Sequence, residues 1–350
     1  MIDTEESNLW KILIVDDEID IHEVTQMALK RLVFRDKAIM FINAYSAAEA
    51  MTELIKHPDI AVALIDVVME NDDSGLELVK IIREEMVNNN IRIIIRTGNP
   101  GLAPEDSVTL NYDINDYRGK TELTAQSLRT VIITALRSYH ALVTINGLQQ
   151  EIDDTQKELI YSLGEIAESR SIDNGHHVKR VGFMSALLAT KLGYCTRDIE
   201  TIHLAASIHD IGKLAIDETI LNKPGKLSYE EFEKMKNHCI FGYNMLKNTN
   251  RELLKVAAVI AYQHHENFDG TGYPQQLKGE EINLSSRIVA LVDVFDALAT
   301  KRVYKEAWPM DEIMQFIEQQ RGLKFDPVIV DLFFENRNEI LEMFYRISAE

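Results

Sequence analysis

Histidine and aspartate side chains that could bind metal ions gather in the second half of the sequence. His209 and Asp210 are adjacent, His264 and His265 are adjacent, and His238 lies between the two pairs. Imidazole nitrogens and carboxylate oxygens without thiolates favour iron or manganese, with zinc and nickel as competitors. The pattern therefore predicts a transition-metal centre.

Two further carboxylates and one histidine extend this set. Asp173 and His177 are four residues apart, so on a helix they share one face. Asp293 lies in the apolar segment RIVALVDVFDALA, where an unpaired buried carboxylate would be costly. The remaining five histidines are interpreted as ordinary core or surface residues: His22, His57, His140, His176 and His203.

A second group of carboxylates lies in the first third of the chain. Asp16 and Asp17 end the apolar run KILIVDD, and Asp66 follows a later apolar run. At one edge of a parallel sheet, three carboxylates would repel one another unless a hard cation such as Mg²⁺ joins them. Thr97 and Lys120 follow the next two segments and offer a hydroxyl and an ammonium to a phosphate group. This arrangement suits a phosphoryl acceptor.

The elements that position these residues differ between the two halves. The runs KILIVDD, AVALIDVV and IRIIIRTG alternate with helical patterns, which predicts an α/β doubly wound parallel sheet of the flavodoxin-like kind. The segments beyond Tyr161 are consecutively helical and predict an all-α domain. Between them, apolar residues near a seven-residue repeat indicate one long helix or a broken pair. A short parallel coiled coil and a helix packed on its own domain both fit this repeat.

We therefore expect four parts. These are an N-terminal tail at 1–9, an α/β domain at 10–125, a helical linker at 126–160 and an all-α domain at 161–350.

Composition restricts the functions that are possible. A net charge of −19 argues against DNA binding, and it requires bound cations at any site for an anionic ester. No run approaches 18 uninterrupted apolar residues and no secretory signal is evident, so we expect a cytoplasmic chain without membrane insertion. Cys195 and Cys239 are too few for a thiolate metal site and are interpreted as packing residues.

Residues 10–125 resemble the response-regulator receiver family through the ordered set of Asp16, Asp17, Asp66, Thr97 and Lys120. The resemblance implies phosphorylation at Asp66 by a sensor histidine kinase, with Asp16 and Asp17 as the Mg²⁺ pair. It further implies that Val68 offers its backbone carbonyl at this site and that Lys120 contacts the phosphate. Thr97 and Tyr117 would form the pair of switch residues. The chain departs from the family where prolines are common, with Glu70 and Thr121 instead.

Residues 160–345 resemble the HD-GYP family of the HD phosphohydrolases. The motifs are His209-Asp210 and HHENFDGTGYP at 264–274. The resemblance implies that Asp210 bridges two ions, that Asp173 holds a third, and that Lys213 contacts a phosphate oxygen. The full implied ligand set is Asp173, His177, His209, Asp210, His238, His264, His265 and Asp293.

The same resemblance implies a substrate and partners. The expected reaction opens cyclic di-GMP to pGpG, with cleavage onward to GMP as an extension, and it implies substrate contacts at Gly272, Tyr273, Arg302 and Lys305. Alternatives are another cyclic dinucleotide, such as 3′,3′-cGAMP, or a catalytically weak receptor acting through a partner. A homodimer and a GGDEF-domain partner are further expectations. We expect phosphorylation to act through the linker helix and to raise, not lower, the phosphodiesterase rate or the extent of dimerisation.

Overall fold

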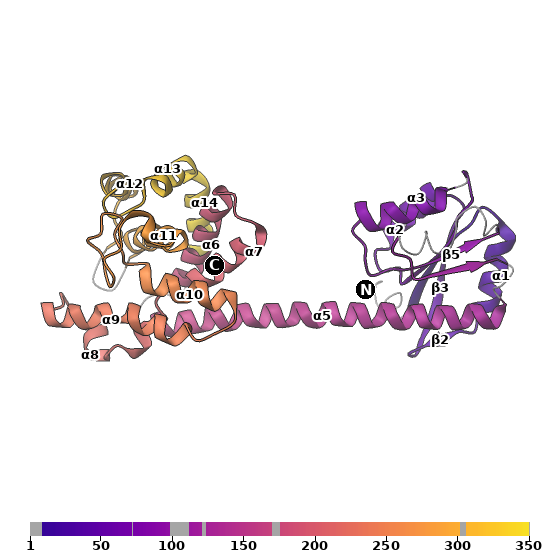
Figure 1. Ribbon diagram of the computed structural model, residues 1–350, viewed down its shortest axis with the longest axis horizontal. Helices are drawn as coiled ribbons and strands as arrows, with labels where there is room; N and C mark the ends of the chain where they lie inside the picture. The colour runs from indigo at the N-terminus through magenta and orange to yellow at the C-terminus, as the bar shows by residue number, and fades with distance from the viewer. Residues whose placement is uncertain are drawn as a thin grey trace. The chain divides into compact units, whose positions relative to one another are not determined.

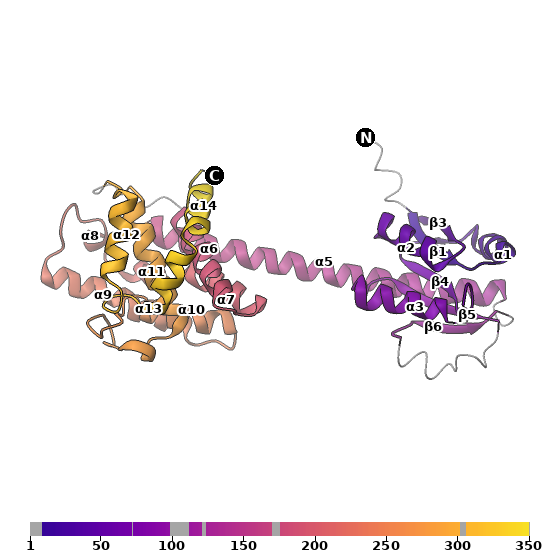
Figure 2. The ribbon, with the colours of Figure 1, turned by 90° about the horizontal axis from the view of Figure 1, so that it is seen from above.

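The computed structural model describes residues 9–71, 73–98, 112–120, 124–169, 176–301 and 306–349. The chain forms two compact units, Met1–Glu151 and Ile152–Glu350. The boundary between them falls within one 45-residue helix, α5 (Ala125–Ser169). Figures 1 and 2 label the helices and strands of both units.

The first unit is built on a six-stranded sheet in the order β2-β3-β1-β4-β5-β6. All neighbouring strands are parallel except the short pair β2 and β3. This confirms the predicted doubly wound parallel sheet. The strands are β1 (Leu9–Val15), β2 (Val33–Phe34), β3 (Lys37–Ala44), β4 (Val62–Asp66), β5 (Arg92–Thr97) and β6 (Asp116–Gly119).

Helices cover both faces of this sheet. One face packs on α2 (Ala47–Lys56) and α3 (Ser74–Lys80), which continues as a π-helical turn over Ile81–Glu85. The other face packs on α1 (Ile19–Leu29) and the start of α5. The strands β1, β4 and β5 are neighbours, run parallel and are buried on both faces. Their carboxyl ends therefore lie at the same edge of the sheet.

Helix α5 begins as a component of the first unit. Leu128, Ile132, Ala135 and Leu136 are buried against the sheet. An 18-residue window of α5 reaches a mean hydropathy of 1.2, so by length and composition alone it could cross a membrane. That is weak evidence, because core helices of soluble domains pass the same test. The absence of a membrane span stays a prediction.

The second unit is helical, as predicted, and its described residues contain no strand. Helix α11 lies at its centre: Val289, Leu291, Val292 and Phe295 are fully buried among the surrounding helices (Figure 1). The helices after α5 are α6 (His176–Lys191), α7 (Thr196–Ala206), α8 (Glu218–Leu221), α9 (Tyr229–Leu246), α10 (Glu252–Gln263), α11 (Leu284–Ala299), α12 (Met310–Gln319), α13 (Pro327–Glu335) and α14 (Arg337–Ser348), with 3-10 turns at Ile211–Ala215 and Gly279–Glu281.

Candidate metal centre and phosphoacceptor site

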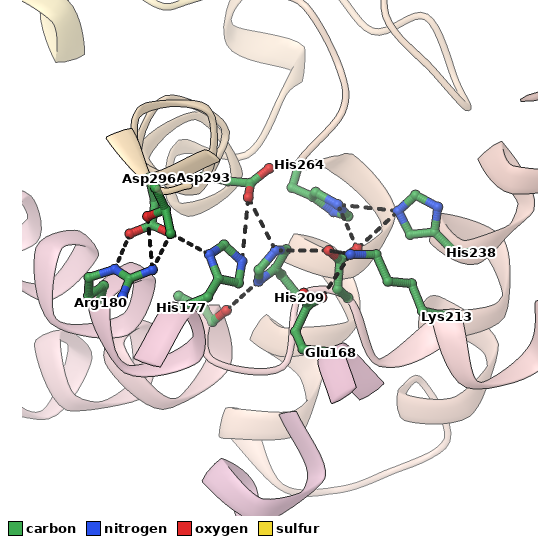
Figure 3. A network of polar contacts seen from close by, with 12 residues as sticks. Glu168, His177, Arg180, His209, Lys213, His238, His264, Asp293 and Asp296 are labelled. Carbon is green, nitrogen blue, oxygen red and sulfur yellow. Dashed lines mark hydrogen bonds and ion pairs between the residues drawn. The ribbon is translucent and has the colours of Figure 1, made fainter. Parts of the chain in front are cut away.

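The first group of candidate metal ligands joins three elements of the second unit. His177 lies in the first turn of α6, His209 in the turn after α7, and Asp293 in α11. Asp293 Oδ1 lies 3.6 Å from His177 Nε2 and 3.7 Å from His209 Nε2 (Figure 3). One ligand atom from each residue could therefore reach the same ion.

The second group lies on α9 and at the end of α10. It consists of His238, His264 and His265, and the Nε2 atoms of His238 and His264 are 3.4 Å apart. Cys239 belongs to the same group, with its Sγ 3.5 Å from His238 Nε2. Burial raises the pKa of this thiol, so it stays protonated in the absence of a metal. Its place beside three imidazoles was not anticipated from the sequence.

The carboxylate of Asp210 lies between the two groups. Its Oδ2 is 3.3 Å from His209 Nε2, while its Oδ1 is 3.2 Å from His238 Nε2 and 3.5 Å from His264 Nε2. Asp210 Oδ1 and His209 Nε2 are buried without a hydrogen bond among the described residues. Buried polar atoms are normally satisfied, and a cation on each side of Asp210 would satisfy these.

Hydrogen bonds fix the imidazole rings in the orientation that metal ligands need. The Nδ1 atoms of His209, His238 and His264 lie 2.8, 2.7 and 3.1 Å from the backbone carbonyls of Ala206, Met235 and Ile260. A carbonyl only accepts, so each Nδ1 donates, and in the neutral ring each Nε2 presents its lone pair to the cluster. The donor set therefore fits metal ions.

His177 is oriented by a carboxylate instead of a carbonyl. Its Nδ1 lies 2.7 Å from Asp296 Oδ2, and Asp296 also accepts hydrogen bonds from Nε and Nη2 of Arg180 (Figure 3). All three residues are almost fully buried. Sequence reasoning missed Asp296 and Arg180, although each lies three residues after a predicted ligand and so on the same helical face.

The carboxylates dominate the electrostatics of this centre. Burial opposes the charged form of His209, but Asp210 and Asp293 outweigh it and raise the pKa of His209 to about 9. Burial likewise opposes ionisation of Asp210, but Lys213 and His209 hold its pKa well below the usual value. Metal ions that take the Nε2 positions would therefore displace protons.

Lys213, predicted to contact phosphate, lies beside the bridging carboxylate. Its Nζ is 2.6 Å from Asp210 Oδ2 and 2.7 Å from Glu168 Oε1. Lys324 was not predicted. It lies in the turn after α12, where burial lowers the pKa of its ammonium and the Asp293 carboxylate opposes that effect.

The Gly-Tyr-Pro loop packs against the second group. The Tyr273 ring lies 4.9 Å from that of His265, and the Tyr273 N–H donates to the His265 carbonyl at 3.2 Å. A Cβ on Gly272 would lie 2.2 Å from the backbone nitrogen of Asn267, so only glycine fits there. Buried Glu266 accepts the backbone N–H of Gln275 and closes the loop. These two predicted substrate residues, Gly272 and Tyr273, thus stand at the metal centre.

Three predicted site residues lie outside the described residues: Asp173, Arg302 and Lys305.

In the first unit, the predicted phosphoacceptor site is assembled at the sheet edge. Asp16 and Asp66 are buried, and Lys120 Nζ lies 2.8 Å from Asp66 Oδ2 and 3.2 Å from Asp16 Oδ2. Asp17 is exposed next to them, in a group with Asp16 and Glu18 that could hold a cation. Burial raises the pKa of Asp66, against the effect of Lys120.

The remaining predicted receiver residues surround this site. Thr97 ends β5 and Tyr117 lies in β6, both buried, and Val68 follows β4 and is partly buried. Arg96 was missed: it is buried, and its Nη2 lies 3.5 Å from Asp16 Oδ2. A guanidinium this near places a protein cation beside the expected Mg²⁺ position.

Comparisons with known proteins agree with both halves of this description. A family model described as HD domain matches residues 161–329. The chain is 30% identical to 3′3′-cGAMP-specific phosphodiesterase 2 of Vibrio cholerae, over 95% of this chain and 92% of that protein. It is 32% identical to the cyclic di-GMP phosphodiesterase response regulator RpfG of Xanthomonas campestris pv. campestris, over 97% of this chain and 90% of that protein.

Among solved structures, a response regulator receiver domain protein from Clostridium thermocellum matches with 25% identity and a TM-score of 0.33. The match covers 38% of this chain and 99% of the chain of that structure. The parallel sheet of the first unit, the match of residues 161–329 to the HD domain and the similarity to RpfG over nearly the whole chain together show a multidomain response regulator, with a receiver-like domain followed by an HD-type domain. The chain belongs to the HD-GYP family of the HD phosphohydrolases, among the members that carry a receiver.

Proposed function

We propose that the second unit is a metal-dependent phosphodiesterase that opens cyclic di-GMP to pGpG and onward to GMP. The observation that supports this most strongly is the Asp210 carboxylate, which faces a histidine group with each of its two oxygens. The similarity to the cyclic di-GMP phosphodiesterase response regulator RpfG extends over nearly the whole chain. An acidic protein that hydrolyses an anionic diester needs cations at the reacting phosphate, and this centre could bind them.

The proposed ligands divide into two groups joined by Asp210. His177, His209 and Asp293 would hold one iron or manganese ion, and His238, His264 and His265 the other, with zinc and nickel as competitors for the same donors. When bound, the ions would supply Lewis acidity and an activated water for in-line attack.

The protein's own residues would orient and neutralise the substrate. The Lys213 ammonium lies close enough to the centre to stabilise charge that develops on a phosphate oxygen. Tyr273 and Gly272 would form one wall of the site, beside His265. Arg302 and Lys305 remain proposed substrate contacts, and Asp173 remains the proposed ligand of a third ion.

The second candidate substrate is 3′,3′-cGAMP, because one relative of nearly full-length similarity is specific for it. Turnover of both compounds by the manganese- or iron-loaded protein, prepared without oxygen, decides between them. A kcat/KM at least about tenfold higher for cyclic di-GMP, or 1.4 kcal/mol of transition-state discrimination, would support the first proposal. A receptor role would instead give binding without turnover of either.

We further propose that a sensor histidine kinase phosphorylates Asp66 and that this raises turnover or promotes dimerisation. Ile145, Ile152, Leu159 and Ile166 recur every seven residues on α5 and are 50–59% exposed. Such a stripe suits a parallel coiled coil between two copies. We also propose that the protein acts in the cytoplasm and that it binds a GGDEF-domain protein as a partner.

A further inference from the structure

Lys213 has a second carboxylate partner that comes from the long helix α5. Glu168 is 2% exposed, and its Oε1 lies 2.7 Å from Lys213 Nζ (Figure 3). We propose that Glu168 is a positioning residue that holds Lys213 for the reaction and shares its positive charge with Asp210. This inference rests on the proposed function and names a route by which α5 can regulate it.

The packing of α5 explains why Glu168 is held so firmly. Gly164 lies one turn before Glu168 and on the same face, where an added Cβ would be 2.4 Å from the Ser207 carbonyl oxygen. Ala167 is also buried in the core of the second unit. The last turns of α5 are therefore fixed against the segment that carries His209.

The charges explain what Glu168 would do for the metal centre. Lys213 lies 2.6 Å from the same oxygen of Asp210 that faces His209. With Asp210 as its only partner, the ammonium would compete with a metal cation for that oxygen. Glu168 offers Lys213 a second anion, so Asp210 remains available to the ions while Lys213 stays at the phosphate position.

This contact also links the centre to the rest of α5. The helix starts at Ala125 in the first unit and ends one residue after Glu168. A hydrogen bond of 2.7 Å is lost when its atoms separate by ~1 Å more. A small shift or rotation of the last turns would therefore remove the Glu168 contact and leave the charge of Lys213 on Asp210.

A double-mutant cycle tests the proposal with Mn²⁺ as the probe. The variants are Glu168→Gln, Lys213→Met and the double variant, with Glu165→Gln as the control, because Glu165 is a partly buried glutamate on the same helix. The full-length protein is titrated with Mn²⁺ against a chelator, and kcat and KM are measured on the hydrolysed cyclic dinucleotide.

We expect Glu168→Gln to weaken Mn²⁺ binding and lower kcat by about tenfold each, with KM nearly unchanged. The same substitution should cost less than about threefold in Mn²⁺ affinity once Lys213 is methionine, because its effect passes through the ammonium. The Glu165→Gln control should match wild type in both measurements.

An equal loss of Mn²⁺ affinity in both backgrounds would mean that Glu168 acts on the ions directly, and it would overturn the proposal. So would a Glu168→Gln variant with wild-type affinity and kcat. If the wild-type protein hydrolyses no cyclic dinucleotide, the proposed function fails, but the Mn²⁺ cycle still decides the role of Glu168.

Discussion

The buried contact between His177 and Asp296 predicts a selective loss of metal affinity. Replacing Asp296 with Asn keeps the volume but removes the charge that orients His177 across a 2.7 Å contact. Loss of such an outer partner typically costs about 10- to 100-fold in metal affinity. We therefore expect the ion of the His177 group to bind about 1.4–2.7 kcal/mol more weakly.

Arg180 complicates this substitution, because it would lose its buried counter-ion. Breaking a buried ion pair by removing one partner destabilises a fold by about 3–5 kcal/mol. Arg180→Met therefore serves as the matched control: it leaves the contact between His177 and Asp296 intact and should reduce stability while sparing metal affinity.

The assay is a competition titration with a chelator, combined with metal counting and thermal unfolding of each variant. The prediction is that Asp296→Asn loses one ion at limiting metal while the group around His238 keeps its own. Equal weakening of both ions, or equal affinity in Asp296→Asn and wild type, would refute the role given to this carboxylate.

Three further outcomes follow from the structure. A small acyl-phosphate donor should add one phosphoryl group to the wild-type protein and none to Asp66→Asn, as measured by intact mass; equal labelling would move the acceptor elsewhere. Burial lowers the pKa of His203 below 6.5, so the unfolded state takes up a proton at this residue first as pH falls. The free energy of unfolding should therefore decrease below about pH 6.5, and it should decrease less steeply in His203→Phe. An equal slope in both proteins would mean that another group controls the acid transition. Gly272→Ala should weaken substrate binding, because its Cβ would meet the Asn267 backbone, while Gly147→Ala on exposed helix surface should leave KM unchanged; the reverse order of KM values would contradict the packing of the loop.

The sequence predicted the sheet well where local pattern and burial agree. The runs that become β1, β4 and β5 are continuous apolar segments, as strands covered on both faces require. The strand β3 was not predicted. It is the parallel neighbour of β1, and only two of its eight residues are buried. Its residues 38–42 form the continuous apolar run AIMFI, but most of its side chains are only partly buried, as suits a strand whose other neighbour is the short strand β2.

The candidate site shows the same division. Motif spacing was enough to select His209, Asp210, His264 and His265 as metal ligands, and the structure brings their side chains together. The supporting residues could not be selected, because their roles depend on contacts between distant segments. Glu168, for example, is 45 residues from its partner Lys213.

The alternatives for the linker could not be separated from sequence for a related reason. The repeat fits a coiled coil and a helix packed on its own domain equally well. In the structure α5 is one helix whose start is buried against the sheet and whose end is buried in the second unit. The exposed stripe between those ends keeps the coiled coil open as a proposal.

The most direct test of the central claim is metal content and cyclic dinucleotide hydrolysis measured together, under anaerobic conditions, in wild type and in Asp210→Ala. The geometry predicts at least two ions and metal-dependent turnover in wild type. In the variant it predicts the loss of both bridged ions and of turnover, with the receiver-like domain still accepting phosphate. An Asp210→Ala protein that keeps its full metal content and its turnover would contradict the bridging role of this carboxylate and the mechanism built on it.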